Sequence, residues 1–443
     1  MKFKRYGILA FVTVLALLLP SVAACARRKR TNKNEYEQIT LPVISIETAN
    51  HEEIIDRTTY VPITLSVTGC ENEQLNITSV TGKIRGRGNS TWEFCEKKSY
   101  KLKLDLEVNL LGAGDGGDKE WALLSNAREK SMLRNYAAFS LAKKMNMRAV
   151  PDCAYATVVL NGEYIGVYLL CETVKFSKNR LNIDDSGTDK DIGYLVELDK
   201  RARSNAESSL EYFFVNDWEV PFSIKSSVKN KAQNRFIKEY FEKTDKAILG
   251  GDREEIEEYV DLSSVVDMYI LEEFTKDRDV GFSSLYFYKE AGGKLVFGYP
   301  WDFDLSLGND SGEDRAMEIN SPKIDYKGAE DLMAAALNRW FGALMGYDWF
   351  VELVTARFFE LEGAFNALYK EVEQLGYSLN DEAERNYARW KVMGKKQLFE
   401  PMKVVLINTY EGQVEYLVTW MKERHDWLEE YFKNYPQSAE TSP

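Results

Sequence analysis

The chain changes its pattern of hydrophobic and polar residues near its middle. From residue 41 to about 125, apolar residues alternate with polar ones or form β-branched runs between polar turns, which is typical of strands. Past about residue 230, apolar residues recur at helical spacing. The pattern therefore predicts an α+β fold with two lobes, a β-rich one at about 41–225 and a mostly helical one at about 226–435.

One helix and one hairpin are expected inside the β-rich half. The segment KSMLRNYAAFSLAKKMNM has apolar residues at helical spacing, with Ser131 as the expected N-cap and Pro151 as the stop signal. The next segment, CAYATVVLNGEYIGVYLLCETV, predicts a β-hairpin that turns at Asn161 and Gly162. A further strand, IGYLVELDK, follows a polar loop.

A short β-pair interrupts the helical half. Two amphipathic helices, NRFIKEYFEKTDKAIL and DLSSVVDMYILEEFTK, come before it. The pair itself consists of SLYFYKE and KLVFGYP around the turn AGG, and it leads directly into WDFD. Three or four more helices are expected between about 328 and 434.

The first residues indicate that the protein is exported, and they are not expected to belong to the folded domain. A basic stretch, an apolar run of about 13 residues and the small-residue ending VAAC predict a lipoprotein signal peptide over 1–24, cleaved before Cys25, whose thiol is then lipidated. An ordinary secretory signal, cut after a nearby alanine, is the alternative. Residues 25–40 are expected to form a charged tether, and 436–443 a disordered tail. The protein would then be anchored to the outer face of the cytoplasmic membrane.

Net charge and histidine content argue against several classes of function and of catalytic site. The formal net charge of −13 argues against a nucleic-acid-binding protein, which needs a basic surface. The two histidines, His51 and His425, lie far apart in the sequence and in unlike contexts. A Ser-His-Asp triad, a Cys-His pair or a histidine-rich metal site is therefore not expected, and any general base should be a carboxylate.

Four cysteines follow Cys25, and their spacing fits no zinc-binding pattern. They are Cys70, Cys95, Cys153 and Cys171. Export permits disulfides, but a domain of this size does not need them. Free, buried thiols are therefore the expectation.

Two aspartates, Asp302 and Asp304, stand in the apolar run PWDFDLSLGN. Buried carboxylates are costly unless something holds them. If WDFD continues the preceding strand, both side chains share one face and could share Mg²⁺, with Asn309 as a third oxygen donor. The alternatives are a solvated turn after the strand and a glycosidase-like acid pair.

The order of elements before this run matches protein kinases. A helix ends near Lys276, a loop carries Asp277 and Asp279, a hairpin follows, and its second strand delivers Asp302. Kinases place a base aspartate, a hairpin and a metal-binding aspartate in the same order. The metal-binding asparagine of the kinase loop is replaced here by Ser284. Helix-loop-hairpin order is common, so a strand-end turn remains open on this observation alone.

A basic cluster lies in GKIRGRGNSTWEFCEKKSYKLKL, within an otherwise acidic chain. Its cations are Arg85, Arg87, Lys97, Lys98, Lys101 and Lys103. Glycines at 86 and 88 let the backbone approach a ligand, and Asn89 and Ser90 offer hydrogen bonds. A nucleotide polyphosphate would suit this cluster, which a glycosidase would leave unexplained. The alternative is an exposed basic face of a two-stranded ribbon.

Three further acids lie on otherwise apolar strands: Glu172, Glu197 and Asp199. Buried acids need partners, and lysines of the basic cluster are candidates. The alternative is that these three acids are exposed to solvent at the ends of their strands. The segment GAGDGG at 112–117 fits G-x-G-x-x-G, but it lacks the strand-to-helix context of a nucleotide-binding loop, so we expect a flexible turn.

Taken together, these motifs resemble the CotH kinase family, which is related to the protein-kinase-like fold. The resemblance covers about 41–435 and rests on RGRGNSTW with KKSYKLKL, KSMLRN, LNGEYIGVYLLCE, YLVELDK, KDRDVGFSSLYFYK and YPWDFDLSLGN. It implies an atypical protein-kinase-like two-lobed fold. It makes Asp302 the metal-binding aspartate and Asp279 the loop aspartate, a candidate base. It places Arg87, Asn89, Lys98 and Lys103 near the phosphates, and Asn135 and Glu172 match family positions as well; we group Glu172 with the nucleotide-binding residues.

The resemblance also implies an activity. Family members resemble kinases that phosphorylate serine-rich coat proteins with ATP and a divalent metal, Mg²⁺ or Mn²⁺. The expected function is therefore a membrane-tethered protein serine kinase acting on a coat or envelope protein. The alternative is a non-catalytic binding or structural envelope lipoprotein on a degenerate scaffold of this family.

Overall fold

The computed structural model describes residues 38–312 and 328–439 of the chain, with side chains to 435. The predicted signal peptide, Cys25 and nearly all of the tether lie outside the described residues, as do the last four residues. Helix α14 (Tyr410–Ala439) includes residues 436–439, which were expected to belong to a disordered tail.

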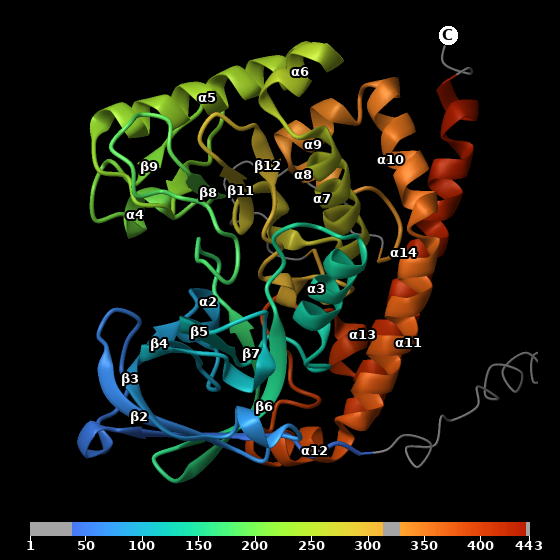
Figure 1. The fold of residues 1–443 in the computed structure, drawn as a ribbon. Coiled ribbons are helices and arrows are strands. Elements are labelled where there is room, and N and C mark those ends of the chain that lie inside the picture. The colour runs from blue at the N-terminus through green and yellow to red at the C-terminus, as the bar shows by residue number, and fades with distance from the viewer. Residues whose placement is uncertain (1–37, 313–327, 440–443) are drawn as a thin grey trace, which may run out of the picture. The chain divides into compact units, whose positions relative to one another are not determined.

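The β-rich half closes into a barrel of seven strands (Figure 1). These are β1 (Val43–Thr48), β2 (Val61–Thr68), β3 (Ile77–Arg87), β4 (Ser99–Val108), β5 (Asp118–Leu124), β6 (Cys153–Leu160) and β7 (Glu163–Glu172). Neighbours are antiparallel except for β1 and β6, whose parallel pairing closes the barrel. Alternate residues such as Ile84, Leu102 and Trp121 are fully buried inside. The alternation in the sequence is therefore that of strands with one face in a common core.

The predicted hairpin is confirmed as β6 and β7. Asn161 and Gly162 form its turn with φ of 52° and 79°, and left-handed backbone at both positions is what this turn type requires. The GAGDGG segment forms the connection between β4 and β5, as expected, with Gly112 and Gly114 at positive φ.

The predicted helix is α3 (Arg134–Lys144), but it begins later than expected. Ser131 is not its N-cap, because its hydroxyl donates to Glu129 (2.6 Å) and accepts from the amide of Leu133 (3.3 Å). The helix also ends well before Pro151. Ser131 instead orders the turn that precedes the helix.

The predicted β-pair, β11 (Leu285–Lys289) and β12 (Leu295–Phe297), is part of a larger sheet. In the described residues this second sheet has the order β12-β11-β8-β10-β9. Its other strands are β8 (Tyr194–Leu198), β9 (Tyr212–Phe213) and β10 (Phe222–Ile224). Aromatic side chains fill the space between this sheet and the helices, with Trp340 fully buried among Phe222, Phe241 and Phe287.

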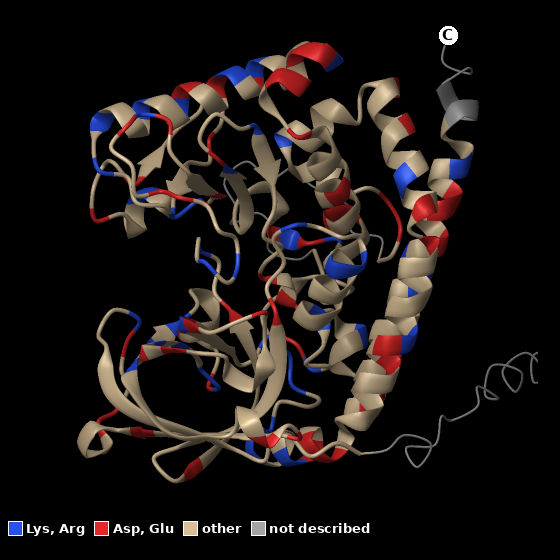
Figure 2. Ribbon diagram, in the orientation of Figure 1, with Lys and Arg blue, Asp and Glu red and all other residues tan. Residues whose placement is uncertain are grey.

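Helices make up most of the remainder. They are α2 (Ser90–Phe94), α4 (Ala202–Asn205), α5 (Lys231–Gly250), α6 (Arg253–Tyr259), α7 (Leu262–Thr275), α8 (Ala334–Leu337), α9 (Arg339–Leu344), α10 (Asp348–Glu360), α11 (Glu362–Ser378), α12 (Asn380–Arg389) and α13 (Met402–Val405). Charged residues cover the outer face of α5 and α6 (Figure 2), as the amphipathic pattern predicts. Within the described ranges, none of the helices is long and apolar enough to cross a membrane. The mixed fold with a β-rich first half and a helical second half is confirmed.

Candidate active site

The WDFD segment forms a sharp turn rather than an extended strand. Strand β12 ends at Phe297, and Phe303–Leu305 form a 3₁₀ turn, η6. Asp302 has left-handed backbone, with φ 72° and ψ 45°. Such backbone is strained for a residue other than glycine and is frequent at functional sites. WDFD therefore does not continue the strand, and Asp302 and Asp304 do not share a strand face.

Helix α3 holds this turn from behind. The Asn135 side-chain oxygen accepts a hydrogen bond from the amide of Phe303 (2.9 Å), and the Phe139 ring stacks on Trp301 at a centroid distance of 5.9 Å. Arg134 donates to the carbonyl of Ser306 (3.1 Å). Asn135 matched the family without an assigned role. It is thus a positioning residue for the turn at residues 301–305, which we call the acidic turn.

Asp302 lies at the surface of a crowded region. Its side chain is exposed to solvent, whereas Asp304 is half-buried. Nearby protein nevertheless raises the pKa of Asp302 by desolvation, against the lowering effect of Arg87 and a hydrogen bond from Ser284. The pKa of Asp304 is raised well above its ordinary value, first by burial and then by the charge of Asp302.

The predicted catalytic loop brings three more acids to this region. It spans the end of α7 and the 3₁₀ turn η5 (Arg278–Gly281). Burial and neighbouring acids raise the pKa of Asp277 well above its ordinary value and that of Glu272 to about 8. Burial and the neighbouring acids therefore favour the protonated form of both groups. Asp279, which is half-buried, is close enough for its charge to raise the pKa of Asp304. The structure thus brings Asp279, Asp302 and Asp304 together.

Three arginines face these acids. Arg87 lies over the Trp301 ring at 4.5 Å and is the strongest opposing charge on Asp302. Arg128 and Arg201 also lower the pKa of Asp302. Arg87 was predicted from the sequence, but Arg128 and Arg201 were not. A site with alternating acids and arginines can hold both a metal cation and the phosphates that the cation neutralises.

Arg128 is the clearest omission from the sequence-based prediction. Only 1% of its surface is exposed, and its Nε and Nη2 atoms have no hydrogen-bond partner. Its guanidinium lies 5.7 Å from the centroid of the Phe94 ring. A buried guanidinium with unused donors beside a site is a strong anion-binding group. Nothing in the sequence SNAREKS distinguishes Arg128 from an exposed arginine.

The residues around Asp302 suit a divalent cation, although they do not form a complete cage. Among residues 38–312 and 328–439, no group of three or more His, Cys, Asp or Glu side chains has the arrangement of a metal site. Two oxygens nearby are buried without a hydrogen-bond partner: Oδ1 of Asn309 and Oδ1 of Asp277. Mutually repelling carboxylates and unpaired oxygens fit a hard cation that takes its other ligands from phosphate and water. Asn309 also donates to the carbonyls of Arg128 (3.0 Å) and Asp304 (2.7 Å), which ties these segments together.

The other predicted ligand-binding residues have different partners. Asn89 accepts a hydrogen bond from Arg57, Lys98 donates to the carbonyl of Trp92 (2.6 Å), and exposed Lys103 pairs with Glu120 (3.4 Å). Glu172 is buried and pairs with Arg180 at 3.1 Å, not with a lysine of the basic cluster. Lys98, Lys103 and Glu172 are not among the groups with the largest effects on the pKa of Asp302. Lys101 and Lys103 of β4 both pair with Glu120, at 2.6 Å and 3.4 Å.

Glu197 and Asp199 are buried rather than solvent-exposed. Lys225 lies 2.6 Å from Glu197 and 3.8 Å from Asp199, so their partner also comes from outside the basic cluster. Burial raises the pKa of Glu197, and Lys225 partly offsets this shift. Next to them, the backbone amide of Arg201 donates to Asp199 (2.9 Å), which fixes the start of the segment that carries Arg201 to the site.

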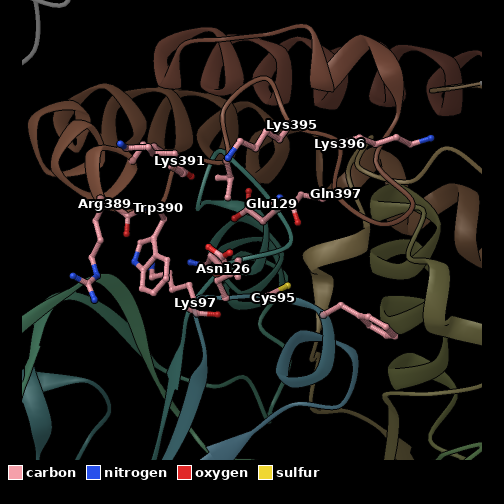
Figure 3. A pocket seen from close by; sticks show the side chains of 17 residues that line it. Cys95, Lys97, Asn126, Glu129, Arg389, Trp390, Lys391, Lys395, Lys396 and Gln397 are labelled. Carbon is pink, nitrogen blue, oxygen red and sulfur yellow. The ribbon is translucent and has the colours of Figure 1, made fainter.

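A cavity of about 540 Å³ is lined by both sequence neighbours of Arg128, Ala127 and Glu129. Figure 3 shows its side chains arriving from the barrel on one side and from the 386–397 segment on the other. Cys95 also lines this cavity. The charges of Arg128 and Asp304 both act on the pKa of the Cys95 thiol, so both groups lie near this wall of the cavity. The cavity and the acidic turn therefore meet at the 127–129 segment.

The cavity is basic in an acidic protein. Its lining includes the cations Lys97, Arg389, Lys391, Lys395 and Lys396 against the acids Glu96 and Glu129. Glu129 is already engaged by Arg134 (3.0 Å) and Ser131. Trp390 and Phe94 add aromatic surface. The volume and the mixture of cations and aromatic rings suit a ligand that carries both negative charge and a flat ring.

Lys97 is the deepest of these cations. It is 5% exposed, its ammonium donates to the carbonyl of Val167, and it lies 4.6 Å from the centroid of the Tyr168 ring. Burial lowers the pKa of Lys97 to about 7, and Glu129 limits the decrease. Gly166 leaves room for the Lys97 side chain, because a Cβ at position 166 would lie only 3.0 Å from Lys97 Cε. Lys97 belonged to the predicted basic cluster, but its burial could not be seen in the sequence.

Comparison with known proteins supports one family. The family model described as CotH kinase protein matches residues 84–428. No curated protein matches the chain. The matched range contains the acidic turn, the loop with Asp279, the arginines beside them and the basic cavity. Because the match spans most of the 443 residues, the chain belongs to the CotH kinase family, whose function is broadly that of a kinase.

Proposed function

We propose that this protein is a protein serine kinase that transfers the γ-phosphate of ATP to a coat or envelope protein. The observation that carries the proposal is the meeting of Asp279, Asp302 and Asp304 with Arg87 and Arg128 beside the basic cavity. Phosphoryl transfer needs positioning and charge stabilisation more than covalent chemistry. This combination of acids and arginines supplies both.

In this account the nucleotide occupies the basic cavity. Its ring lies against Trp390, its phosphates extend over the 127–129 segment, and the unused donors of Arg128 bind them. Asp302 and Asp304 would hold Mg²⁺ or Mn²⁺, which when bound neutralises phosphate charge and polarises the transferred group.

Asp279 is the residue we assign to the acceptor hydroxyl. Burial and neighbouring acids raise the pKa values of Asp277 and Glu272, which disfavours their carboxylate forms. Asp277 is buried, whereas Asp279 is partly accessible. Asp279 would therefore orient the serine hydroxyl and accept its proton. Arg87, beside Asp302, would stabilise the charge that develops on the phosphoryl oxygens.

We propose further that the enzyme is tethered to the outer face of the cytoplasmic membrane through lipidated Cys25. The support is the N-terminal sequence, with its basic, apolar and VAAC segments. Fractionation of cells tests this: the wild-type protein should sediment with membranes and release into detergent, and Cys25→Ser should not be processed or lipidated. Equal lipid labelling of both proteins would contradict the assignment.

The alternative, a non-catalytic envelope protein on the same scaffold, differs in nucleotide binding. Our proposal predicts that ATP with Mg²⁺ or Mn²⁺ raises the thermal midpoint by several degrees at saturating concentration, and that chelator removes the shift. Arg128→Gln should abolish most of the shift, because it removes the buried donors that face the phosphates. A wild-type midpoint insensitive to ATP and metal would favour the alternative.

Nucleotide binding should also depend on pH through Lys97. Because its pKa is about 7, Lys97 is cationic below this value and neutral above it. ATP affinity is therefore expected to fall several-fold from about pH 6 to about pH 8, as measured by calorimetry. Lys97→Met should flatten this profile at a lower affinity, whereas Lys395→Met, an exposed lysine of the same cavity, should keep its slope. An unchanged slope in Lys97→Met would contradict the assignment.

A further inference from the structure

Two cysteines lie opposite each other in the register of the β6–β7 hairpin. Cys153 opens β6, and Cys171 lies directly opposite it in the antiparallel register. The neighbouring amide of Glu172 donates to the carbonyl of Asp152 (2.9 Å). The pair 152 and 172 is therefore the hydrogen-bonded one, and Cys153 and Cys171 form a non-hydrogen-bonded pair.

This position has the spacing of a disulfide. Cα atoms of non-hydrogen-bonded pairs lie about 4.5 Å apart, inside the range of about 4.4–6.8 Å that disulfides span. Both residues are free thiols in the structure, and the neighbouring Cys153 contributes to the raised pKa of Cys171. The other described cysteines, Cys70 and Cys95, lie after β2 and at the end of α2. Cys153 and Cys171 can thus be joined without movement of the sheet.

The two thiols differ in access. Cys171 is fully buried, and burial raises its pKa well above the ordinary value, whereas Cys153 is half-exposed. An external reagent therefore meets Cys153 first. This is the arrangement of an attacking thiol with a resolving thiol behind it.

We propose that Cys153 and Cys171 form a structural disulfide when a thiol–disulfide oxidoreductase outside the cytoplasm acts on the exported protein. The Cys153 thiolate attacks the disulfide of the oxidoreductase and forms a mixed disulfide, releasing one thiolate of that enzyme. The Cys171 thiol gives its proton to that thiolate, and its sulfur attacks the Cys153 sulfur. The second sulfur of the oxidoreductase leaves as a thiolate and takes up from water the proton that Cys153 lost when it ionised. The products are the Cys153–Cys171 disulfide and the oxidoreductase in its dithiol form, so two thiols are oxidised and one disulfide is reduced.

The disulfide would lie beside the proposed active site. Cys171 is among the groups whose charge acts on Arg87, and Arg87 is the cation against Asp302 and Trp301. Linking β6 to β7 fixes the part of the barrel wall behind Arg87. The chemistry rests on export, but it needs no kinase activity, so the two proposals can fail separately.

The test uses the purified full-length chain, incubated with oxidised glutathione as the probe. Free thiols are then alkylated and the digest is analysed by mass spectrometry. We expect a Cys153–Cys171 linked peptide with a mass lower by about 2 Da than the two reduced peptides together, and a thermal midpoint several degrees higher than that of the reduced protein. Cys70 and Cys95 should be alkylated only after unfolding.

Single variants separate the two roles. Cys171→Ser should accumulate a stable glutathione adduct on Cys153, because the resolving thiol is gone. Cys153→Ser should leave Cys171 unmodified in the folded protein. Full alkylation of both cysteines in wild-type protein after oxidation, or a persistent glutathione adduct on Cys153 in the wild type, would overturn the proposal.

Discussion

Asp302→Asn is expected to reduce the rate of phosphate transfer by about 10³-fold or more without unfolding the protein. Asp302 is exposed, and its pKa is raised by the protein around it. A group whose pKa is higher in the folded state than in the unfolded chain destabilises the fold once it ionises, so at neutral pH the charge opposes folding. The thermal midpoint of Asp302→Asn should therefore equal or exceed that of the wild type, while the transfer of labelled phosphate is lost.

A matched control is Asp105→Asn. Asp105 is also exposed, and its carboxylate accepts a hydrogen bond from the Thr81 hydroxyl (2.5 Å) on the barrel. Its replacement should leave the transfer rate within about twofold of the wild type. If Asp302→Asn kept more than a tenth of the wild-type rate, Asp302 would not be the metal-binding aspartate.

Glu273→Gln is expected to have the largest effect on stability. Glu273 in α7 and Arg424 in α14 are 1% and 0% exposed and lie 2.7 Å apart. Removing the carboxylate charge takes away a buried counter-charge 2.7 Å from the guanidinium, and breaking a buried ion pair on one side costs about 3–5 kcal/mol of unfolding free energy. Glu273 also accepts hydrogen bonds from the amides of Met333 (2.5 Å) and Ala335 (3.2 Å), so the chain that returns after residue 328 loses support as well.

Denaturant unfolding of the single and double variants tests this ion pair. Replacing both partners with apolar or neutral residues of similar size, Glu273→Gln with Arg424→Met, should cost less than Glu273→Gln alone, because no charge is left buried. A loss below about 1 kcal/mol for Glu273→Gln would show that Arg424 finds another counter-charge.

Local elements could be predicted from the sequence where short-range patterns decide the structure. The hairpin turn at Asn161 and Gly162 is set by backbone that few residues adopt. The burial of Leu102 and Leu104 follows from strict alternation along β4. The WDFD turn was placed correctly after the hairpin, but its left-handed backbone at Asp302 was not foreseen. That backbone is imposed by α3, through Asn135 and Phe139.

Long-range pairing could not be predicted. The barrel closes because β1 pairs in parallel with β6, more than 100 residues later, and no local pattern specifies this partner. Lys103 and Asn89 were assigned to the phosphates because they carry suitable groups in the right motif. Strand alternation fixes the face on which a side chain lies, but not which ligand or neighbour it meets there. Lys103 pairs with Glu120 instead, and Asn89 accepts a hydrogen bond from Arg57.

Buried cations were the least predictable part of the site. Arg128 and Lys97 are almost fully enclosed, whereas arginine and lysine are exposed in most proteins. Their burial depends on how the 127–129 segment and the 386–397 segment meet around one cavity. In sequence these segments lie more than 250 residues apart. The acids of the site and Arg87 could be inferred from the motifs, whereas the role of Arg128 and the burial of Lys97 became apparent only from the fold.

The most direct test of the proposed function is phosphate transfer by the purified wild-type chain. The protein is incubated with γ-labelled ATP and Mg²⁺ or Mn²⁺, with a serine-rich peptide and with itself as acceptors, and modified residues are identified by mass spectrometry. The account predicts label on serine that disappears with chelator and in Asp302→Asn. Folded wild-type protein that transfers no label with either metal, or label that persists in Asp302→Asn, would contradict it.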